Sequence, residues 1–222
     1  MPDHKTSTST AKTLTPPRAA AVAGILFAVL MSTSLIIVRV AVPDARTDAG
    51  QWLTDPLRRN AVLFALQLAP FAGIAFLWFI GVVRNRLGQL EDQFFATVFF
   101  GSGLLFVASL FASAGLFGAL LKTMADGHAR VDNNAYYLIR QVGGSFLNVF
   151  AIKMAGVFVV STGTIILRTG ILPRWVAFSG FACALVLLLV ITNWPWIALL
   201  FPLWILVVSV CVVLGRTHAT AN

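Results

Sequence analysis

The polar and charged side chains that could do chemistry are concentrated in one otherwise apolar run in the second half of the chain. Gln141, Ser145 and Asn148 are separated by four and then three residues, so on a helix they share one face. Arg140 lies near the beginning of the run and Lys153 lies deeper in it. Amides, a hydroxyl and basic groups in this arrangement could bind an anion, a lipid headgroup or a polar solute. These five residues are the candidate solute or lipid contacts.

Lys153 has two readings that the sequence leaves open. It is fourteen residues from Leu167, the end of the run, which is roughly 21 Å on a helix. In a hydrocarbon core of about 30 Å, its Cα then lies about 9 Å below the opposite edge. The functional reading makes it an anion, headgroup or substrate contact in an outward-opening cavity. The structural reading makes it a snorkelling side chain, or one bonded to backbone carbonyls and Asn148.

Metal, haem and proton-relay chemistry lack the residues that they need. His4, His128 and His218 fall outside the apolar runs, and no Asp or Glu falls inside one. Cys183 and Cys211 sit at depths that differ by roughly 9 Å, too far for a disulfide. We therefore expect no catalytic residue, no metal and no cofactor.

One loop segment approaches a catalytic motif. Asp126–Arg130 resembles the beginning of the motif of CDP-alcohol phosphotransferases. The spacer is one residue short, and the further Asp pair that would hold a divalent metal is absent. We interpret the similarity as chance.

Composition indicates a membrane protein. Of the 222 residues, 59% are hydrophobic and 11% are charged, whereas soluble domains average about 45–50% and about 25%. The net charge is +8, but the sixteen Lys and Arg residues are not clustered as in a nucleic-acid-binding protein. We expect anionic membrane lipids as partners and no nucleic acid. A homo-oligomer is left open.

Six apolar runs are each long enough to cross a bilayer as a helix. They cover residues 19–42, 61–83, 94–121, 138–167, 175–192 and 194–214. The predicted fold is therefore all-α, a polytopic six-helix membrane bundle in one domain, residues 19–215. Residues 1–18 are rich in Ser, Thr and Pro and predict a disordered cytoplasmic tail, and residues 216–222 predict a short one.

Basic residues favour one orientation of this bundle. Six spans place both termini on one side, and the segments on that side carry eight basic residues against five in the opposite loops. The eight are Lys5, Lys12, Arg18, Arg84, Arg86, Arg168, Arg174 and Arg216, and the five are Arg46, Arg58, Arg59, Lys122 and Arg130. The positive-inside rule then predicts that both termini are cytoplasmic.

Local signals refine this picture. Gly170 should end one helix in a left-handed conformation, and Pro173 should begin the next. Pro70 and Pro202 fall inside apolar runs and should kink them. Small residues recur at helical spacing in the first three runs and should let backbones approach closely. The three sets are Ala20, Gly24, Ala28 and Ser32; Ala61, Ala65, Ala69 and Gly73; and Ala108, Ala112, Gly115 and Ala119.

The second half of the chain resembles a known group of sequences. The segments Leu138–Arg140 and Leu167–Trp175 resemble uncharacterised six-helix membrane proteins of actinobacteria and firmicutes, classed as domain-of-unknown-function families. Phe201–Trp204 resembles the actinobacterial members. The resemblance implies a bacterial plasma membrane, and no functional residue can be carried over from it.

These observations lead to two functional hypotheses. The leading one is an integral multi-pass membrane protein without enzymatic activity, an accessory or regulatory component of the envelope. The alternative is a small transporter or channel for an anionic or lipid-like solute that uses the polar face of residues 141–148. An enzyme ranks below both, because paired acid and base groups are missing.

Overall fold

The computed structural model describes residues 16–43, 51–87, 93–125, 133–189 and 196–217, and every element within them is helical. The all-helical prediction is confirmed for this part of the chain. The α-helices are α1 (Pro16–Ala41), α2 (Pro56–Leu87), α3 (Gln93–Ala125), α4 (Asn133–Ser145), α5 (Ile152–Thr169), α6 (Arg174–Leu189) and α7 (Leu200–Thr217). Shorter elements are the 3-10 helices η1 (Gln51–Thr54) and η3 (Ile197–Leu199) and the π-helix η2 (Phe146–Ala151).

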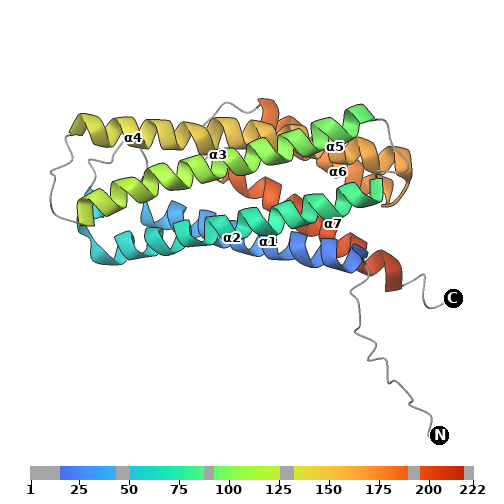
Figure 1. The fold of residues 1–222 in the computed structure, drawn as a ribbon, viewed down its shortest axis with the longest axis horizontal. Coiled ribbons are helices and arrows are strands. Elements are labelled where there is room, and N and C mark those ends of the chain that lie inside the picture. Colours follow the sequence, from blue (N-terminus) through green and yellow to red (C-terminus); the bar gives the residue numbers. More distant parts are fainter. Residues whose placement is uncertain (1–15, 44–50, 88–92, 126–132, 190–195, 218–222) are drawn as a thin grey trace, which may run out of the picture.

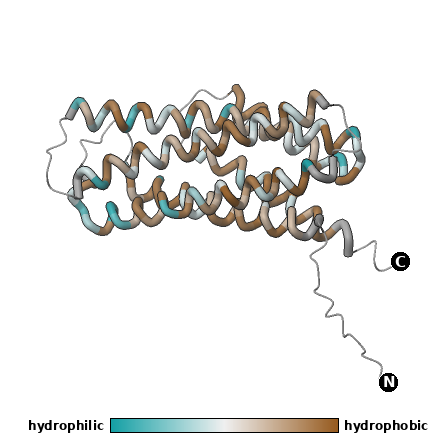
Figure 2. Tube along the Cα trace, viewed as in Figure 1, coloured by the Kyte–Doolittle hydropathy of each residue, from teal (hydrophilic) through white to brown (hydrophobic). Residues whose placement is uncertain are grey.

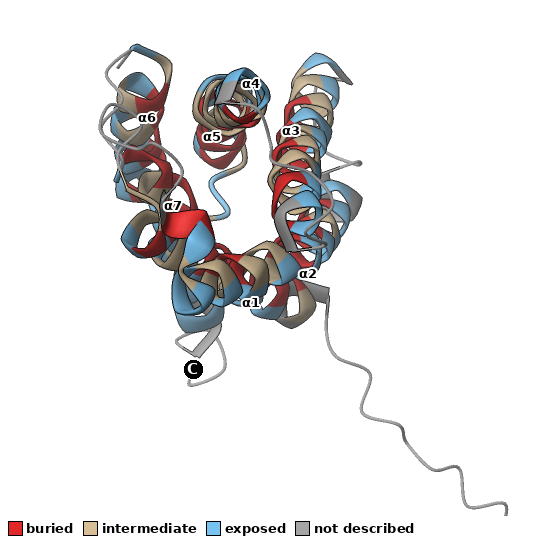
Figure 3. Ribbon diagram, turned by 90° about the vertical axis from the view of Figure 1, so that its left-hand side faces the viewer, coloured by how far each residue is buried: buried red, intermediate tan, exposed pale blue. Residues whose placement is uncertain are grey.

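The helices form an elongated bundle in which α4, η2 and α5 follow one another as a single rod, here called the α4–α5 rod (Figure 1). Viewed along the bundle, this rod lies opposite α1, between α3 and α6 (Figure 3). The beginning of α1 and the end of α7 lie at the same end of the bundle, which we call the tail end (Figure 1). The opposite end, where α1 ends and α4 begins, is called the far end. α1 and α2 run along the bundle in opposite directions, and so do α3 and the α4–α5 rod (Figure 1).

Five helices are long and apolar enough to cross a membrane, counting the α4–α5 rod as one. Hydrophobic residues dominate their central parts, and hydrophilic residues gather toward the two ends (Figure 2). The predicted fifth span, residues 175–192, corresponds to α6, which is described from Arg174 to Leu189. The last three residues of that prediction, 190–192, lie outside the described residues. The described 16 residues are about 24 Å long.

Other helix ends lie beyond the predicted apolar runs. α1 begins at Pro16 rather than Ala19, α2 covers 56–87 rather than 61–83, and the α4–α5 rod covers 133–169 rather than 138–167. The reason is that a helix can continue into water on polar residues, whereas hydropathy detects only its apolar part. The remainders of the two predicted tails, residues 1–15 and 218–222, lie outside the described residues.

The turn between α5 and α6 follows the sequence prediction. Gly170 adopts the left-handed conformation, with φ 63° and ψ 14°, and its N–H donates to the carbonyl of Ile166 at 2.9 Å. Only a residue without Cβ reaches this conformation at little cost. α6 then begins directly after Pro173, whose carbonyl accepts from the N–H of Val176 at 3.0 Å. Pro202 lies in the first turn of α7, where its missing N–H leaves no intrahelical bond unmade.

Aromatic rings occupy the centre of the bundle. Phe27, Phe76, Phe106, Phe158 and Phe201 come from five different helices and are all buried. Ring centroids are 4.6 Å apart for Phe27 and Phe76, and 4.8 Å apart for Phe106 and Phe201. Tilted and edge-to-face pairs at such distances add to simple burial. A second, smaller cluster at the far end contains Trp52, Val62, Leu120, Leu121 and Tyr136.

Small residues separate into buried and exposed sets. On α1 and α2, Gly24, Ala65 and Gly73 are buried between helices, and the Ser34 hydroxyl donates to the Ala65 carbonyl at 2.8 Å. Close backbone approach explains this direct bond. On α3, by contrast, the prediction of internal packing is wrong for Ala108, Gly115 and Ala119, which are exposed. α3 instead packs through larger side chains such as Phe99 and Phe106.

Candidate functional site

The five candidate residues lie along the α4–α5 rod, but its π-helix divides them. A π-helix has more residues in each turn than an α-helix. Side chains before and after η2 therefore point in different relative directions from those on a continuous α-helix. Gln141 is exposed, Ser145 and Asn148 are half-buried, and Asn148 belongs to η2 itself. The predicted common face of Gln141, Ser145 and Asn148 therefore does not line one internal site.

Lys153 is hydrogen-bonded to the end of α6. Its Nζ donates to the carbonyl oxygens of Leu187 at 3.1 Å and of Leu188 at 2.6 Å. Both carbonyls belong to the last described turn of α6. The ammonium therefore joins the α4–α5 rod to that turn. This contact corresponds to the backbone-carbonyl part of the structural reading of Lys153, whereas Asn148 has a different partner.

Asn148 is bound by Arg39, a residue that the sequence analysis did not select. Arg39 Nη2 donates to Asn148 Oδ1 at 2.9 Å, although the two residues are 109 positions apart. Arg39 is half-buried near the end of α1, on the far-end side of the bundle. The signal that could have revealed it is that Arg39 alone interrupts the first apolar run with a charge. The bond joins α1 to η2.

Arg140 also connects the α4–α5 rod to α1, but here the arginine belongs to the rod and its acceptor lies just after α1. Its Nη2 donates to the backbone carbonyl of Pro43, just after α1, at 2.7 Å. Its Nη1 donates to the Tyr136 hydroxyl at 2.8 Å, which also accepts from Trp52 Nε1 at 3.1 Å. Arg140 thus anchors α4 to the end of α1 and to the far-end cluster. The sequence analysis did not predict this network.

Among the described residues, Gln141 and Ser145 make no such connection between helices. The Ser145 hydroxyl donates to the carbonyl of Gln141 at 2.8 Å, within the same helix. Such a bond satisfies the hydroxyl locally. A neighbouring helix contact is made instead by Ser113 of α3, whose hydroxyl donates to the Gly143 carbonyl at 2.8 Å. Gln141 is exposed, and Ser145 is half-buried without a described contact to another helix.

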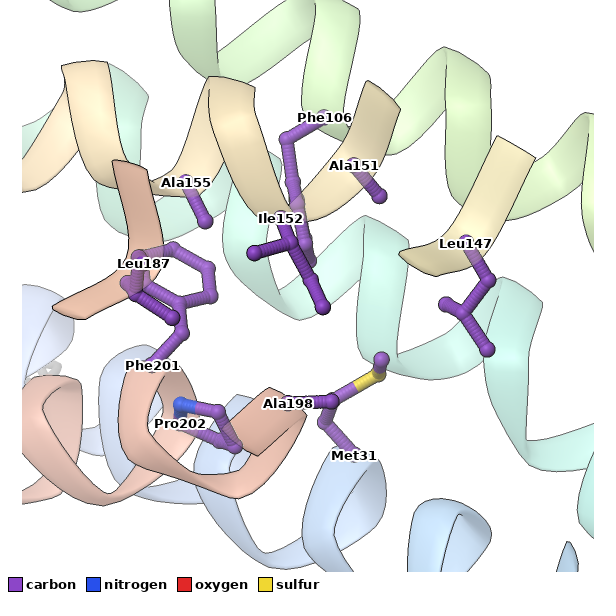
Figure 4. A pocket seen from close by; sticks show the side chains of 10 residues that line it. All are labelled: Met31, Phe106, Leu147, Ala151, Ile152, Ala155, Leu187, Ala198, Phe201 and Pro202. Atoms are coloured by element: carbon purple, nitrogen blue, oxygen red, sulfur yellow. The ribbon is translucent and has the colours of Figure 1, made fainter. Parts of the chain in front are cut away.

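A small apolar pocket lies beside η2, where α1, the α4–α5 rod, α6 and η3–α7 meet (Figure 4). Its volume is about 10 Å³, close to the minimum for one water molecule. Met31, Leu147 and Ile152 line it together with Leu187 and Pro202. Two candidate residues adjoin it along the chain, because Asn148 follows Leu147 and Lys153 follows Ile152. No polar side chain lines the pocket itself.

Two arginines at the tail end lie over aromatic rings of α3. The guanidinium carbon of Arg84 is 4.6 Å from the centroid of Phe100, and that of Arg168 is 4.4 Å from the centroid of Phe95. Both arginines are exposed. Stacking uses the face of a guanidinium and leaves its edge, which carries the N–H donors, directed away from the ring.

Within the described ranges, no three His, Cys, Asp or Glu side chains come together as metal ligands would. Cys183 and Cys211 are half-buried free thiols. No protein-family model matches the chain, and neither a curated protein nor a solved structure is significantly similar to it. The resemblance to bacterial six-helix proteins stays a prediction.

Proposed function

We propose that the chain is a six-pass protein of a bacterial plasma membrane, with both termini in the cytoplasm, which serves the envelope as a non-enzymatic component. Five apolar helices support the membrane location. The shared position of the first and last described helix ends supports an even number of passes (Figure 1). We assign the remaining pass to α6, which Lys153 binds through the carbonyls of Leu187 and Leu188.

The orientation follows from charge at the tail end. Arg84, Arg168 and Arg174 are exposed there, and two of them are stacked on α3. Arginines next to helix ends favour the cytoplasmic side. Their N–H edges suit the phosphates of anionic lipids, so we assign these lipids as partners of the tail end.

The non-enzymatic role is supported mainly by the hydrogen bonds that the basic side chains within the apolar runs make. Arg39, Arg140 and Lys153 each donate hydrogen bonds to oxygen atoms of another part of the bundle. They connect α1 to the α4–α5 rod and that rod to α6. Basic groups used in this way stabilise a helix arrangement, whereas a transport path needs them around a hydrated cavity. The pocket beside η2 is apolar and about 10 Å³ in volume.

Two measurements test this proposal. Isolated membranes should retain the protein after washing with high salt and alkaline carbonate and should release it in detergent. Proteoliposomes loaded with a chloride-sensitive dye should then show the same anion flux as protein-free liposomes. An anion flux that Lys153→Met abolishes would overturn the proposal and establish the transporter or channel.

A further inference from the structure

One side of α2 is exposed along the middle of the helix. α2 packs mainly on α1 and α3, and six residues on its remaining side are all exposed. They are separated by three and four residues in turn, which is the spacing of the contact face in a left-handed pair of helices. This face, here called the α2 seam, consists of Phe64, Gln67, Phe71, Ile74, Trp78 and Gly81. None of the six is charged.

Gln67 is the one polar side chain of the α2 seam, and it lies at the depth of the hydrocarbon. Arg59 and Arg84 flank the uncharged part of α2, and Gln67 is about 7 Å along the helix from the midpoint between them. A core of about 30 Å centred on that midpoint reaches roughly 8 Å beyond Gln67 on its nearer side. Only two methylene groups separate the Cα of Gln67 from its amide. The amide is therefore too close to the backbone to reach the headgroups.

The Gln67 amide has no partner within the described part of its own chain. No hydrogen bond joins it to another described residue, although an amide side chain has two donor hydrogens and an acceptor oxygen. Pro70 adds a second polar group on this side. It is exposed, and it lacks the N–H that would bond to the Leu66 carbonyl in a regular helix. Acyl chains offer neither donors nor acceptors, so these groups need a partner from another protein chain.

A second copy of this chain supplies a partner of the required chemistry. Copies in one membrane share one orientation, so a twofold axis along the membrane normal brings two α2 helices together in parallel. Each residue then lies at the same depth as its counterpart, and Gln67 meets Gln67. A carboxamide is self-complementary, because its NH₂ group donates and its carbonyl oxygen accepts. The absence of charge on the α2 seam means that the two faces do not repel each other.

We propose that the α2 seam joins two copies of the chain into a parallel dimer, with reciprocal hydrogen bonds between the two Gln67 amides. The proposal rests on the membrane placement given above and goes beyond it, because it assigns a partner to one surface. One polar position in an apolar seam fixes the register of parallel helices. A Cβ at Gly81 would meet nothing within 4 Å, so the position one turn from Trp78 leaves room for the indole of the second copy.

The first test measures association of the purified full-length protein in liposomes. Cys183 and Cys211 are replaced with Ala, a cysteine at Asn222 carries a donor or an acceptor dye, and energy transfer is followed as lipid dilutes the protein. Gln67→Met keeps the size of the side chain and removes the amide. It should raise the midpoint protein-to-lipid ratio of association about three- to fifteenfold, the range for hydrogen bonds between membrane helices.

Two further variants show that the amide is responsible. Gln67→Asn keeps a carboxamide and should associate more strongly than Gln67→Met. The matched control is Gln141→Met, because Gln141 is also an exposed glutamine but belongs to α4. Its midpoint should equal that of the wild type. Thermal melting in detergent verifies that each variant is folded.

Disulfide crosslinking then locates the contact. A single cysteine in Ile74→Cys, on the α2 seam, should give covalent dimers when the liposomes are oxidised, because the twofold axis brings the two positions together. Leu105→Cys is the control, since Leu105 is exposed on α3. It should stay monomeric under the same conditions.

The outcomes separate the dimer from the membrane placement. Wild-type energy transfer no greater than that of randomly distributed monomers at every dilution would overturn the proposal. Unchanged association of Gln67→Met, or crosslinking at position 105 but not at 74, would also overturn it. If Gln67→Met does not fold, the Ile74→Cys and Leu105→Cys pair still decides. A protein that alkaline carbonate removes from membranes would contradict the membrane placement instead.

Discussion

Lys153 Nζ lies 2.6 Å from the carbonyl oxygen of Leu188 and so connects the α4–α5 rod to the last turn of α6. This relationship holds the described part of α6 against the rod, because the same ammonium also donates to the carbonyl of Leu187. Lysine is suited to this position because its ammonium offers three donors and can therefore bond to both carbonyls.

Replacing Lys153 with Met should therefore destabilise the protein. The substitution removes two hydrogen bonds from a charged donor, which costs about 1–3 kcal/mol. Thermal unfolding in detergent should show a lower midpoint for Lys153→Met than for the wild type. Lys122→Met is the control, because Lys122 is exposed on α3 and its loss should change little. A Lys153→Met protein at least as stable as the wild type would show that the ammonium destabilises the folded protein overall.

Arg39 and Asn148 should be energetically coupled. Their hydrogen bond of 2.9 Å joins α1 to η2 across a long stretch of sequence. A double-mutant cycle with Arg39→Met and Asn148→Leu should give a coupling of about 0.5–1.5 kcal/mol, the range for hydrogen bonds between membrane helices. Unfolding free energies in detergent or bicelles provide the measurement. The control cycle pairs Arg39→Met with Gln141→Leu, where Gln141 is exposed and the effects should add. Additivity in the first cycle would contradict the contact.

Glycines should respond to alanine according to their surroundings. A Cβ at Gly180 would lie 2.7 Å from the Trp204 ring, and the indole cannot fold away. Gly180→Ala should therefore lower the unfolding midpoint, by an amount typical of overpacking, about 1–3 kcal/mol. At Gly115 a Cβ would meet nothing within 4 Å, so Gly115→Ala should raise stability by up to about 1 kcal/mol through helix propensity. A change of stability in the same direction for both variants would contradict the packing of α6 on α7.

Periodicity and hydropathy predicted the helical fold because they depend on residues close together in sequence. The left-handed Gly170 and the beginning of α6 after Pro173 were predicted for the same reason. The contact between Lys153 and α6 was not predicted as such, because the partner carbonyl of Leu188 lies 35 positions further along the chain and hydropathy does not register tertiary contacts.

In the candidate site, too, the residues were predicted from the sequence but their tertiary contacts were not. Arg140, Asn148 and Lys153 were recognised because polar groups are conspicuous in an apolar run. Their partners were not, because Arg39 and the Pro43 carbonyl meet them only through tertiary contacts. The π-helix has no local sequence signal, yet it decides which side chains share a face. The shared face of Gln141 and Asn148 was predicted for a regular α-helix, and η2 interrupts that helix.

Single-cysteine labelling in intact cells tests the central claim, a six-pass bundle with cytoplasmic termini, most directly. Cys183 and Cys211 are first replaced with Ala, and one cysteine at a time is introduced at Asp48, Arg86, Asp126, Thr169 or Asn222. A membrane-impermeant maleimide should label positions 48 and 126 in intact cells, and positions 86, 169 and 222 only after the cells are opened. Labelling of position 222 in intact cells would contradict the bundle's placement in the membrane. The same conclusion would follow if positions 48 and 86 were both labelled in intact cells or both only in opened cells.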